Sequence, residues 1–300
     1  MLKNYQSQIF IQDDCEYAKN IVKTFFPKLN IKMKSFQDFK SAVKEYEPDL
    51  IVLDRLNNSA SFVESIKKTS KVISFEDLGT GALLTDITFN EIYNKPVFKS
   101  DNIHWGPNSF LIRDAFRILP KNKFRKRVKD ILITFGGIDP RNLSLFILRI
   151  LFDYFDQLKS INFHLILGPG YPFSMTHLNK FQSIENLHIY PASKDIASIM
   201  SKCDIGICSN GRTVFELAHL SIPSIVIPQH EREANHDFPD ESKGFIKLGF
   251  NSEVHTKKAF LKALFKLLDN QNRKRLYHNM KEISFSNNKK YIKEKIYEKI

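Results

Sequence analysis

Cysteine is scarce in this sequence. Its three cysteines, Cys15, Cys203 and Cys208, follow no metal-binding spacing. So small and odd a number excludes a disulfide-stapled secreted scaffold and favours core thiols in a reducing compartment. The sequence has no run of 18 apolar residues and no signal-peptide pattern, so we predict a cytoplasmic protein without a transmembrane segment.

The sequence also lacks an Asp-x-Asp pair, low-complexity tracts and an excess of acid. Without Asp-x-Asp we predict metal independence, and nothing in the pattern calls for a cofactor. Lys and Arg number 45 against 33 Asp and Glu, a formal net charge of +12 that is densest at residues 121–129 and from Lys289 onward. This charge fits an anionic small substrate or peripheral contact with an acidic membrane, although a general lysine bias explains it most simply. No nucleic-acid-binding module accompanies it, so we expect no nucleic acid partner.

Apolar, strand-like runs alternate with helical patterns along the chain. Strands are expected at 9–12, 31–33, 49–54, 71–75, 87–90, 109–112, 131–135, 162–167, 187–190, 204–208 and 224–227. Helices are expected at 16–26, 36–45, 59–69, 143–154, 196–201, 213–220, 257–268 and 291–300, and 245–248 is expected in a helical turn. Such alternation predicts parallel sheets covered on both faces.

The basic stretch 121–129 separates two such blocks and is interpreted as a linker. We therefore predict an α/β protein of two Rossmann-like domains facing a cleft. The expected limits are 1–118 for an incomplete N-terminal sugar-side or acceptor-side domain, 128–285 for a nucleotide-binding domain and 286–300 for a C-terminal helix.

The clearest functional pattern lies in the turn after the strand that ends at Cys208. Ser209, Asn210 and Gly211 form a turn of small residues, and a helix begins at Thr213. Such a turn exposes backbone N–H groups and the positive end of the helix dipole, which together favour a phosphate. The hydroxyls of Ser209 and Thr213 add two donors. The alternative is a turn shaped only by geometry, because strand–turn–helix units occur in every parallel α/β protein.

Two other features accompany this turn. Glu216, in the first turn of the helix, suits ribose hydroxyls, or alternatively acts only as an acid favourable to the helix dipole. Gly136 and Gly137 follow the strand at 131–135 and permit close approach of a ligand, or alternatively form a tight strand-to-helix turn.

Three segments resemble the UDP-binding domain of GT-B nucleotide-sugar enzymes: 131–142 (ILITFGGIDPRN), 204–216 (DIGICSNGRTVFE) and 222–229 (IPSIVIPQ). Among these enzymes, the segments resemble the UDP-sugar hydrolases of pseudaminic-acid biosynthesis and their spore-coat polysaccharide homologues. The wider family includes the N-acetylglucosaminyltransferase that makes the last lipid-linked precursor of peptidoglycan. The resemblance covers roughly residues 49 to 250.

The resemblance implies a set of roles. The nucleotide-binding residues would be Gly136, Gly137, Ser209, Asn210, Gly211, Thr213, Glu216 and Gln229. Gln229 and Asn235 would point at the sugar or at an attacking water, or alternatively belong to an ordinary polar loop. The substrate would be a UDP-sugar that is attacked at its anomeric carbon, with UDP leaving. Water as the attacking group gives hydrolysis and an acceptor hydroxyl gives glycosyl transfer, and the residues leave this choice open.

The sequence departs from the family at one motif. The family's first strand ends in a Gly-x-Gly-His-x-x-Arg turn that holds the expected catalytic base, whereas no such turn occurs here and no histidine precedes His104. We therefore expect the first domain to lack its first strand, turn and helix. Either this N-terminal unit is missing, or an upstream or separate domain supplies it, or this protein has another chemistry. His230 and His236 are candidates to replace the base. The alternative function is a non-catalytic nucleotide-sugar-binding protein or an inactive partner subunit.

Overall fold

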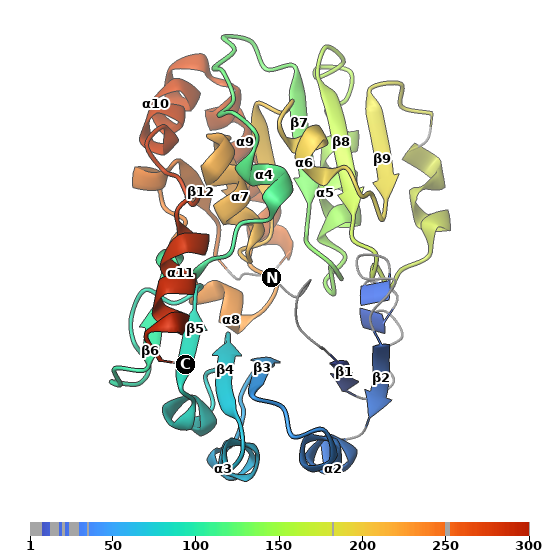
Figure 1. Cartoon of the computed structure of the whole chain (residues 1–300). Helices are drawn as coiled ribbons and strands as arrows, with labels where there is room; N and C mark the ends of the chain where they lie inside the picture. The colour runs from blue at the N-terminus through green and yellow to red at the C-terminus, as the bar shows by residue number, and fades with distance from the viewer. Residues whose placement is uncertain are drawn as a thin grey trace. The chain divides into compact units, whose positions relative to one another are not determined.

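The computed structural model describes residues 8–12, 18–19, 22–23, 30–34, 36–181, 183–249 and 253–299 (Figure 1). This part of the chain forms two compact units. The first contains the residues described up to Phe89, with 97–104 and 298–299, and the second contains 90–96 and 105–297. The expected helix at 16–26 lies largely outside the described residues.

The second unit is built on a six-stranded sheet in the order β12-β11-β10-β7-β8-β9, and all its strand pairs are parallel. Its strands are β7 (Asp130–Thr134), β8 (Asn162–Leu167), β9 (Leu187–Pro191), β10 (Ile205–Cys208), β11 (Ser224–Val226) and β12 (Phe245–Lys247). Figure 1 shows β7, β8 and β9 next to one another in green to yellow. Ile131 and Ile133 are buried in one apolar cluster and Leu132 in another, so β7 is apolar on both faces. This is the pattern of a parallel strand between two helical layers.

Helices cover both faces of this sheet. One apolar cluster takes side chains from α5 (Leu143–Phe152), α9 (Glu253–Leu268) and α10 (Asn270–Met280). The other takes side chains from α6 (Ile196–Met200) and α7 (Thr213–Leu220). The remaining helical elements of this unit are η3 (Pro107–Ser109), α4 (Asp114–Arg117), η4 (Met175–Phe181), α8 (Glu231–Ala234), η5 (Glu241–Lys243) and α11 (Asn288–Tyr297).

The strand order places a topological switch between β7 and β10. The chain runs outward from β7 through β8 to β9, then returns to pair β10 with the other side of β7 and continues outward to β12. Thr134 is in register with Cys208, so β7 and β10 end at the same level. In doubly wound sheets the ligand crevice lies at the carboxyl ends of the strands at this switch.

The first unit contains a four-stranded sheet in the order β3-β4-β5-β6 and a parallel two-stranded sheet of β1 (Gln8–Gln12) and β2 (Asn30–Lys34). The larger sheet consists of β3 (Leu50–Asp54), β4 (Lys71–Phe75), β5 (Ile87–Asn90) and β6 (Ile103–Trp105). Its helical elements are α2 (Phe36–Tyr46), α3 (Ala60–Lys67) and η2 (Thr80–Leu84). Val63 and Ile66 of α3 pack with Val72 of β4 in its core. The β3–β4 and β4–β5 pairs are parallel, so the predicted α/β class is confirmed in both units.

Two expectations about elements are wrong, and one helix was not expected. Residues 245–248 do not form a helical turn, because Phe245–Lys247 pairs as edge strand β12 with β11. The expected strand at 109–112 is absent, and Phe110 instead packs its ring against Phe215 and Phe285. Helix α10 was not foreseen, because its polar sequence gives a weak apolar pattern.

Residues 121–129, which the sequence predicts to be a linker, are anchored on the second unit. The buried Arg273 donates to the backbone oxygens of Arg125 and Lys126, each at 2.9 Å, and also to those of Leu267 and Leu268. Arg125 forms an ion pair with Asp204 at 2.6 Å. Arg125, from within the stretch, and Arg273, from α10, therefore hold it against the rest of the second unit.

Among the helices described, none combines the length and the apolar character that crossing a bilayer requires.

Candidate functional site

Four loops converge at the carboxyl edge of the second unit's sheet, and glycine allows a positive φ at Gly136 and a close backbone approach at Gly168. Gly136, after β7, has a φ of +79°, and a Cβ there would lie 3.8 Å from Ser209 Oγ in the loop after β10. A Cβ on Gly168, after β8, would meet the backbone oxygens of Gly136 and Gly137 at 2.3 Å. Gln229, after β11, donates its Nε2 to the backbone oxygen of Phe135 at 2.9 Å. The predicted glycine and polar residues therefore lie together.

The N-terminus of α5, which follows the Gly136-Gly137 turn, is already satisfied by the protein. The buried Asp139 accepts hydrogen bonds from the backbone N–H groups of Leu143 at 2.8 Å and Ser144 at 2.9 Å. Burial raises the pKa of Asp139, and these donors oppose that rise. A protein carboxylate thus occupies the place that an anion would take at this helix.

The N-terminus of α7 differs, because among the described residues no side chain accepts a hydrogen bond from the backbone N–H groups of Thr213, Val214 or Phe215. The helix begins at Thr213, and the turn before it contains the buried Ser209 and Asn210 together with Gly211. Uncapped N–H groups at the positive end of a helix favour an anion. Of the two helices that follow the switch-point turns, α7 is therefore the one available for a phosphate.

Asn210 links this turn to the loop after β11. Its Nδ2 donates to the backbone oxygens of Glu233 at 2.5 Å and His236 at 3.0 Å, while His236 Nδ1 lies 2.8 Å from the Asn210 backbone oxygen. The buried side-chain atoms in these two loops that have no hydrogen-bond partner among the described residues include three that can act as acceptors: Asn210 Oδ1, Gln229 Oε1 and His236 Nε2. Buried polar atoms are rarely left unpaired, so this cluster suits a donor-bearing ligand or water.

Glu216, the predicted ribose acceptor, lies in the first turn of α7 and is 5% exposed. Its Oε1 accepts from Arg113 Nε at 2.7 Å, an ion pair between residues 103 positions apart that sequence reasoning missed. Burial raises the pKa of Glu216, and Arg113 and Arg212 oppose that rise. Glu216 Oε1 is therefore held by Arg113 next to the turn.

Glu233 is a second residue that sequence reasoning missed. This largely buried acid accepts from the Gln229 backbone N–H at 2.8 Å through Oε2, and its Oε1 lies 3.2 Å from the Cβ position of Gly211. The Ser209 hydroxyl also donates to the carboxylate. Its closeness to the turn depends on a contact between loops 22 residues apart, and no local pattern indicates it.

The three predicted catalytic residues lie in or beside α8. His230 caps this helix: its Nδ1 accepts from the Glu233 backbone N–H at 3.2 Å, so a neutral ring carries its proton on Nε2. His236 donates Nδ1–H to a carbonyl, so its neutral ring leaves Nε2 as a bare lone pair. Burial lowers the pKa of His236 to about 4. Asn235 is exposed at the C-terminal end of α8.

No group of three or more His, Cys, Asp or Glu side chains among the described residues is arranged to hold a metal ion.

A family model for the glycosyltransferase family 28 C-terminal domain matches residues 131–296. The match covers more than half of the 300 residues and contains all four convergent loops. The chain belongs to glycosyltransferase family 28.

Three curated relatives of this family 28 chain are informative. It is 27% identical over 249 residues to the protein MJ1062 of Methanocaldococcus jannaschii, which covers 76% of this chain and 50% of that protein. It is 23% identical over 239 residues to the spore coat polysaccharide biosynthesis protein SpsG of Bacillus subtilis, covering 77% of this chain and 68% of SpsG. It is 25% identical over 207 residues to a pseudaminic acid cytidylyltransferase and UDP-2,4-diacetamido-2,4,6-trideoxy-beta-L-altropyranose hydrolase of Helicobacter pylori, covering 68% of this chain and 34% of that protein. The chain thus spans half the length of MJ1062 and about a third of the Helicobacter protein.

A solved structure agrees with the family 28 assignment at the level of the fold. Acinetobacter baumannii MurG aligns with a TM-score of 0.63 at 14% identity, covering 98% of this chain and 91% of that one. The predicted GT-B fold class is confirmed by this likeness and by the parallel sheets. The predicted resemblance to GT-B nucleotide-sugar enzymes with spore-coat and pseudaminic-acid relatives is likewise confirmed.

Proposed function

We propose that this chain binds a UDP-sugar through the domain assigned to 128–285 and cleaves its anomeric C–O bond, with UDP leaving. The observation that carries the proposal is the uncapped N-terminus of α7 at the β7–β10 switch, inside the family 28 match. Backbone dipoles there would stabilise the charge that grows on the diphosphate as the bond breaks. The reaction then needs no metal ion.

The residues around this turn would contact the ribose and the sugar of the substrate. Glu216 would accept from ribose hydroxyls, because its side chain is held beside the turn by Arg113. Asn210 Oδ1, Gln229 Oε1 and His236 Nε2 are all acceptors, so hydroxyl groups of a sugar or of water would satisfy them. Asn235 is exposed next to this cluster in sequence and would contact the sugar or the attacking group.

The relatives suggest the biological setting. SpsG is named for spore coat polysaccharide biosynthesis, and the Helicobacter protein is named as a UDP-sugar hydrolase of the pseudaminic acid route. We place this chain in bacterial surface-glycan or nonulosonic-acid biosynthesis, in the cytoplasm, where buried reduced thiols such as Cys203 and Cys208 persist. Water as attacking group makes it a hydrolase, and an acceptor hydroxyl makes it a glycosyltransferase.

A second candidate is a non-catalytic nucleotide-sugar-binding protein or partner subunit. The histidines favour it, because His230 is engaged as a helix cap and His236 is fully buried. UDP binding without UDP release from any UDP-sugar, even with an added upstream domain, would support this alternative.

UDP is expected to bind more tightly than uridine, by about 10- to 100-fold. The difference comes from charge-assisted hydrogen bonds of the diphosphate at the turn before α7, which contribute about 1.5–3 kcal/mol each before offsets. Titration calorimetry with both compounds at equal ionic strength measures it. Equal affinities would exclude the diphosphate role of this turn. An assay of UDP release from UDP-N-acetylglucosamine, with and without an acceptor, then separates hydrolysis from transfer.

A further inference from the structure

The Glu233 carboxylate lies against the turn that the proposed function assigns to the diphosphate. Its Oε2 takes the Gln229 backbone N–H at 2.8 Å, and the Ser209 hydroxyl also donates to the carboxylate. Its Oε1 faces Gly211, 3.2 Å from the position of a Cβ there. The Glu233 carboxylate therefore accepts hydrogen bonds at the same turn where the diphosphate of the proposed ligand would place its negative charge.

The groups around this carboxylate do not neutralise it fully. Among the described residues, the positively charged group nearest to it by ion-pair distance is the ring of His230, whose Nε2 lies 4.0 Å from Oε1 and is charged only when protonated. The strand β10 contributes the Cys208 thiol, whose pKa is raised by burial and by the charges of Glu233 and Glu216. Within the described part of the chain, the buried Glu233 carboxylate is therefore surrounded by hydrogen-bond donors and by other acidic groups, Cys208 and Glu216, rather than by a permanent positive charge.

We infer that Glu233 is a gating acid, whose carboxylate holds this turn in the empty protein and takes up a proton when a nucleoside diphosphate replaces it. The inference rests on the proposed function. Burial already raises the pKa of Glu233, and the donors Gln229, Asn210 and Ser209 and the charge of His230 oppose that rise. A diphosphate would withdraw donors from the carboxylate and add like charge, both of which raise this pKa further.

The proton taken up by Glu233 makes the affinity for UDP depend on pH. A group whose pKa rises on binding takes up protons at any pH between its values in the free and bound states. UDP affinity should therefore decrease as the pH rises through and above the pKa of Glu233 in the empty protein. Glutamine at this position keeps the shape and a hydrogen-bond acceptor but has no proton to gain.

Calorimetric titration with UDP, from about pH 5.5 to 8 in buffers of different ionisation enthalpy, tests this proton uptake. The comparison is Glu233→Gln against Glu231→Gln, an exposed acid of the same helix. Protonation of UDP itself is common to all three proteins and cancels in the differences. We expect wild type and Glu231→Gln to take up to one additional proton per UDP, and Glu233→Gln to bind UDP about tenfold more tightly near pH 8.

The outcomes separate this inference from the function on which it rests. Equal proton uptake by Glu233→Gln and Glu231→Gln, with equal pH dependence of affinity, would overturn the gating role of Glu233. Failure of the folded wild-type protein to bind UDP at any pH would instead overturn the proposed function. Thermal unfolding shows whether Glu233→Gln folds. If it does not fold, the wild-type protein alone still tests the inference. Proton uptake on UDP binding that is no larger than the protonation of UDP itself accounts for would contradict the gating role.

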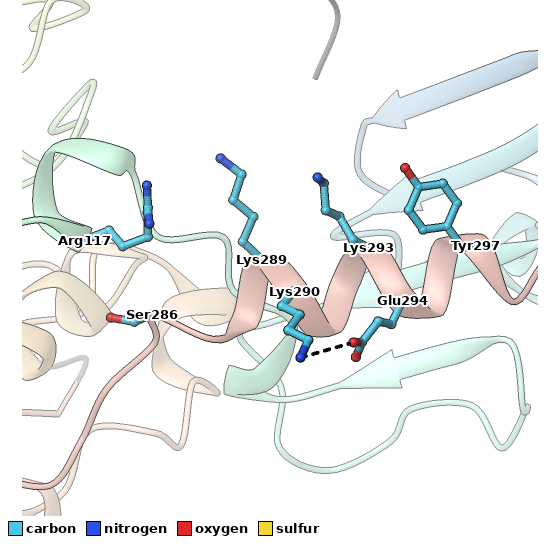
Figure 2. Close-up of a pocket in the computed structure, with 7 residues that line it drawn as sticks. All are labelled: Arg117, Ser286, Lys289, Lys290, Lys293, Glu294 and Tyr297. Atoms are coloured by element: carbon cyan, nitrogen blue, oxygen red, sulfur yellow. Dashed lines mark ion pairs between the residues drawn. The ribbon is translucent and has the colours of Figure 1, made fainter.

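A different part of the second unit carries an independent inference. Lys289, Lys293 and Tyr297 follow one another every four residues on α11, so they lie on one face of the helix. With Arg117, Ser286, Lys290 and Glu294 they line an open pocket of about 450 Å³. Figure 2 shows Arg117, Lys289, Lys293 and Tyr297 pointing to the same side of the helix, whereas Lys290 and Glu294 point to the other. We call the four residues of the first side the basic row.

The helix that carries the basic row is fixed by its opposite face. Ile292 is 3% exposed in the interior, and Asn288 donates its Nδ2 to the backbone oxygens of Pro107 at 2.7 Å and Phe110 at 3.0 Å. The basic row itself is exposed: Tyr297 has 71% of its surface accessible. The packing of the helix therefore does not account for these side chains.

The basic row has more positive than negative charge. Asp114 is its acidic partner, at 3.2 Å from Arg117 Nε and 3.3 Å from Lys289 Nζ. Lys293 has no acid within ion-pair distance among the described residues. Three cations against one acid leave a net charge of about +2, while on the other side Lys290 is paired with Glu294 at 3.8 Å.

The geometry points to the basic row as a contact for an anionic phospholipid surface. A single small anion gains little from exposed, flexible lysines, because solvent screens each pair and ordering the side chain is costly. A charged bilayer acts on all of them together, and each lysine or arginine near it strengthens binding about fivefold. Tyrosine favours the headgroup level, where its ring and hydroxyl are both satisfied. The sequence prediction of peripheral membrane contact thereby acquires a location.

Co-sedimentation with phosphatidylcholine vesicles, with and without about 30% phosphatidylglycerol, tests this contact at about 0.1 M salt. Lys293→Ala should weaken binding to the anionic vesicles about fivefold, and Lys289→Ala with Lys293→Ala about 20-fold. Lys290→Ala is the matched control: it removes the same charge from the other side of the helix and should change binding less than twofold.

Other outcomes would overturn the contact. Equal losses for Lys290→Ala and Lys293→Ala would mean that only net charge matters. Equal binding to neutral and anionic vesicles would exclude the charge-based contact. Tighter binding to a single-stranded oligonucleotide, weakened by the same two substitutions, would assign the basic row to nucleic acid instead.

Discussion

Replacing Gly211 with aspartate is expected to lower the affinity for UDP by about two orders of magnitude. A Cβ at this position would lie 3.2 Å from Glu233 Oε1 and 3.8 Å from Ser209 Oγ, so the new carboxylate would stand at the turn itself. Two unit charges about 4 Å apart at a protein surface repel by roughly 4 kcal/mol, before screening by salt. The diphosphate would meet this charge in addition to that of Glu233.

Gly211→Asn is the control that separates charge from size. Asparagine has nearly the same shape as aspartate but carries no charge, and Gly211 does not require a left-handed backbone conformation. Its Cβ requires the Glu233 carboxylate to move by only a few tenths of an ångström, so we expect a loss of less than tenfold. Calorimetry measures both affinities, and thermal unfolding checks that both variants fold. Wild-type affinity in the aspartate variant would show that the diphosphate binds elsewhere.

Replacing His236 with asparagine is expected to slow UDP release from a UDP-sugar by about 10²- to 10⁴-fold, the usual contribution of a general base. The neutral ring of His236 suits this role, because Nδ1 donates to the Asn210 carbonyl and Nε2 keeps a lone pair that has no partner among the described residues. Its Nε2 is buried, so a loop movement has to expose it to the attacking group. The amide nitrogen of asparagine can replace Nδ1 as donor, so the variant removes Nε2 while keeping the loop attached.

The pH dependence gives a second signature of His236. Because burial lowers its pKa to about 4, the neutral base is present above that value and is lost as the pH falls through it. The rate should therefore stay flat from neutral pH down to about 5 and then fall.

His230→Ala provides the comparison for this prediction. His230 uses Nδ1 to cap α8 and carries its proton on Nε2 when neutral, so we expect a loss of less than tenfold. Steady-state rates and UDP affinity are measured for both variants. A rate unchanged in His236→Asn, with UDP binding intact, would show that the base comes from another residue or another polypeptide.

The sequence alone predicted two turns that the structure brings together at the switch between β7 and β10. The strands that end before Gly136 and Ser209 are short apolar runs, and parallel strands in a doubly wound sheet end at the same edge. Local chemistry was therefore sufficient to predict two turns near the switch. It was not sufficient at Phe245, where pairing with β11 outweighed the helical pattern, nor at Phe110, where ring contacts with Phe215 replaced a strand.

The charges of the site were decided by the tertiary structure. The sequence determined the α/β class, the parallel sheets, the turns and the presence of Glu216 at the start of α7, because each depends on periodicity or on residues close together in the chain. Only the fold brought Arg113 to Glu216 and placed Glu233 over Gly211. Only the fold let Asp139 close the N-terminus of α5 while α7 stayed uncapped, and turned His236 Nδ1 toward Asn210. Most of these contacts join segments more than 20 residues apart, and ionisation follows burial and neighbours rather than sequence position.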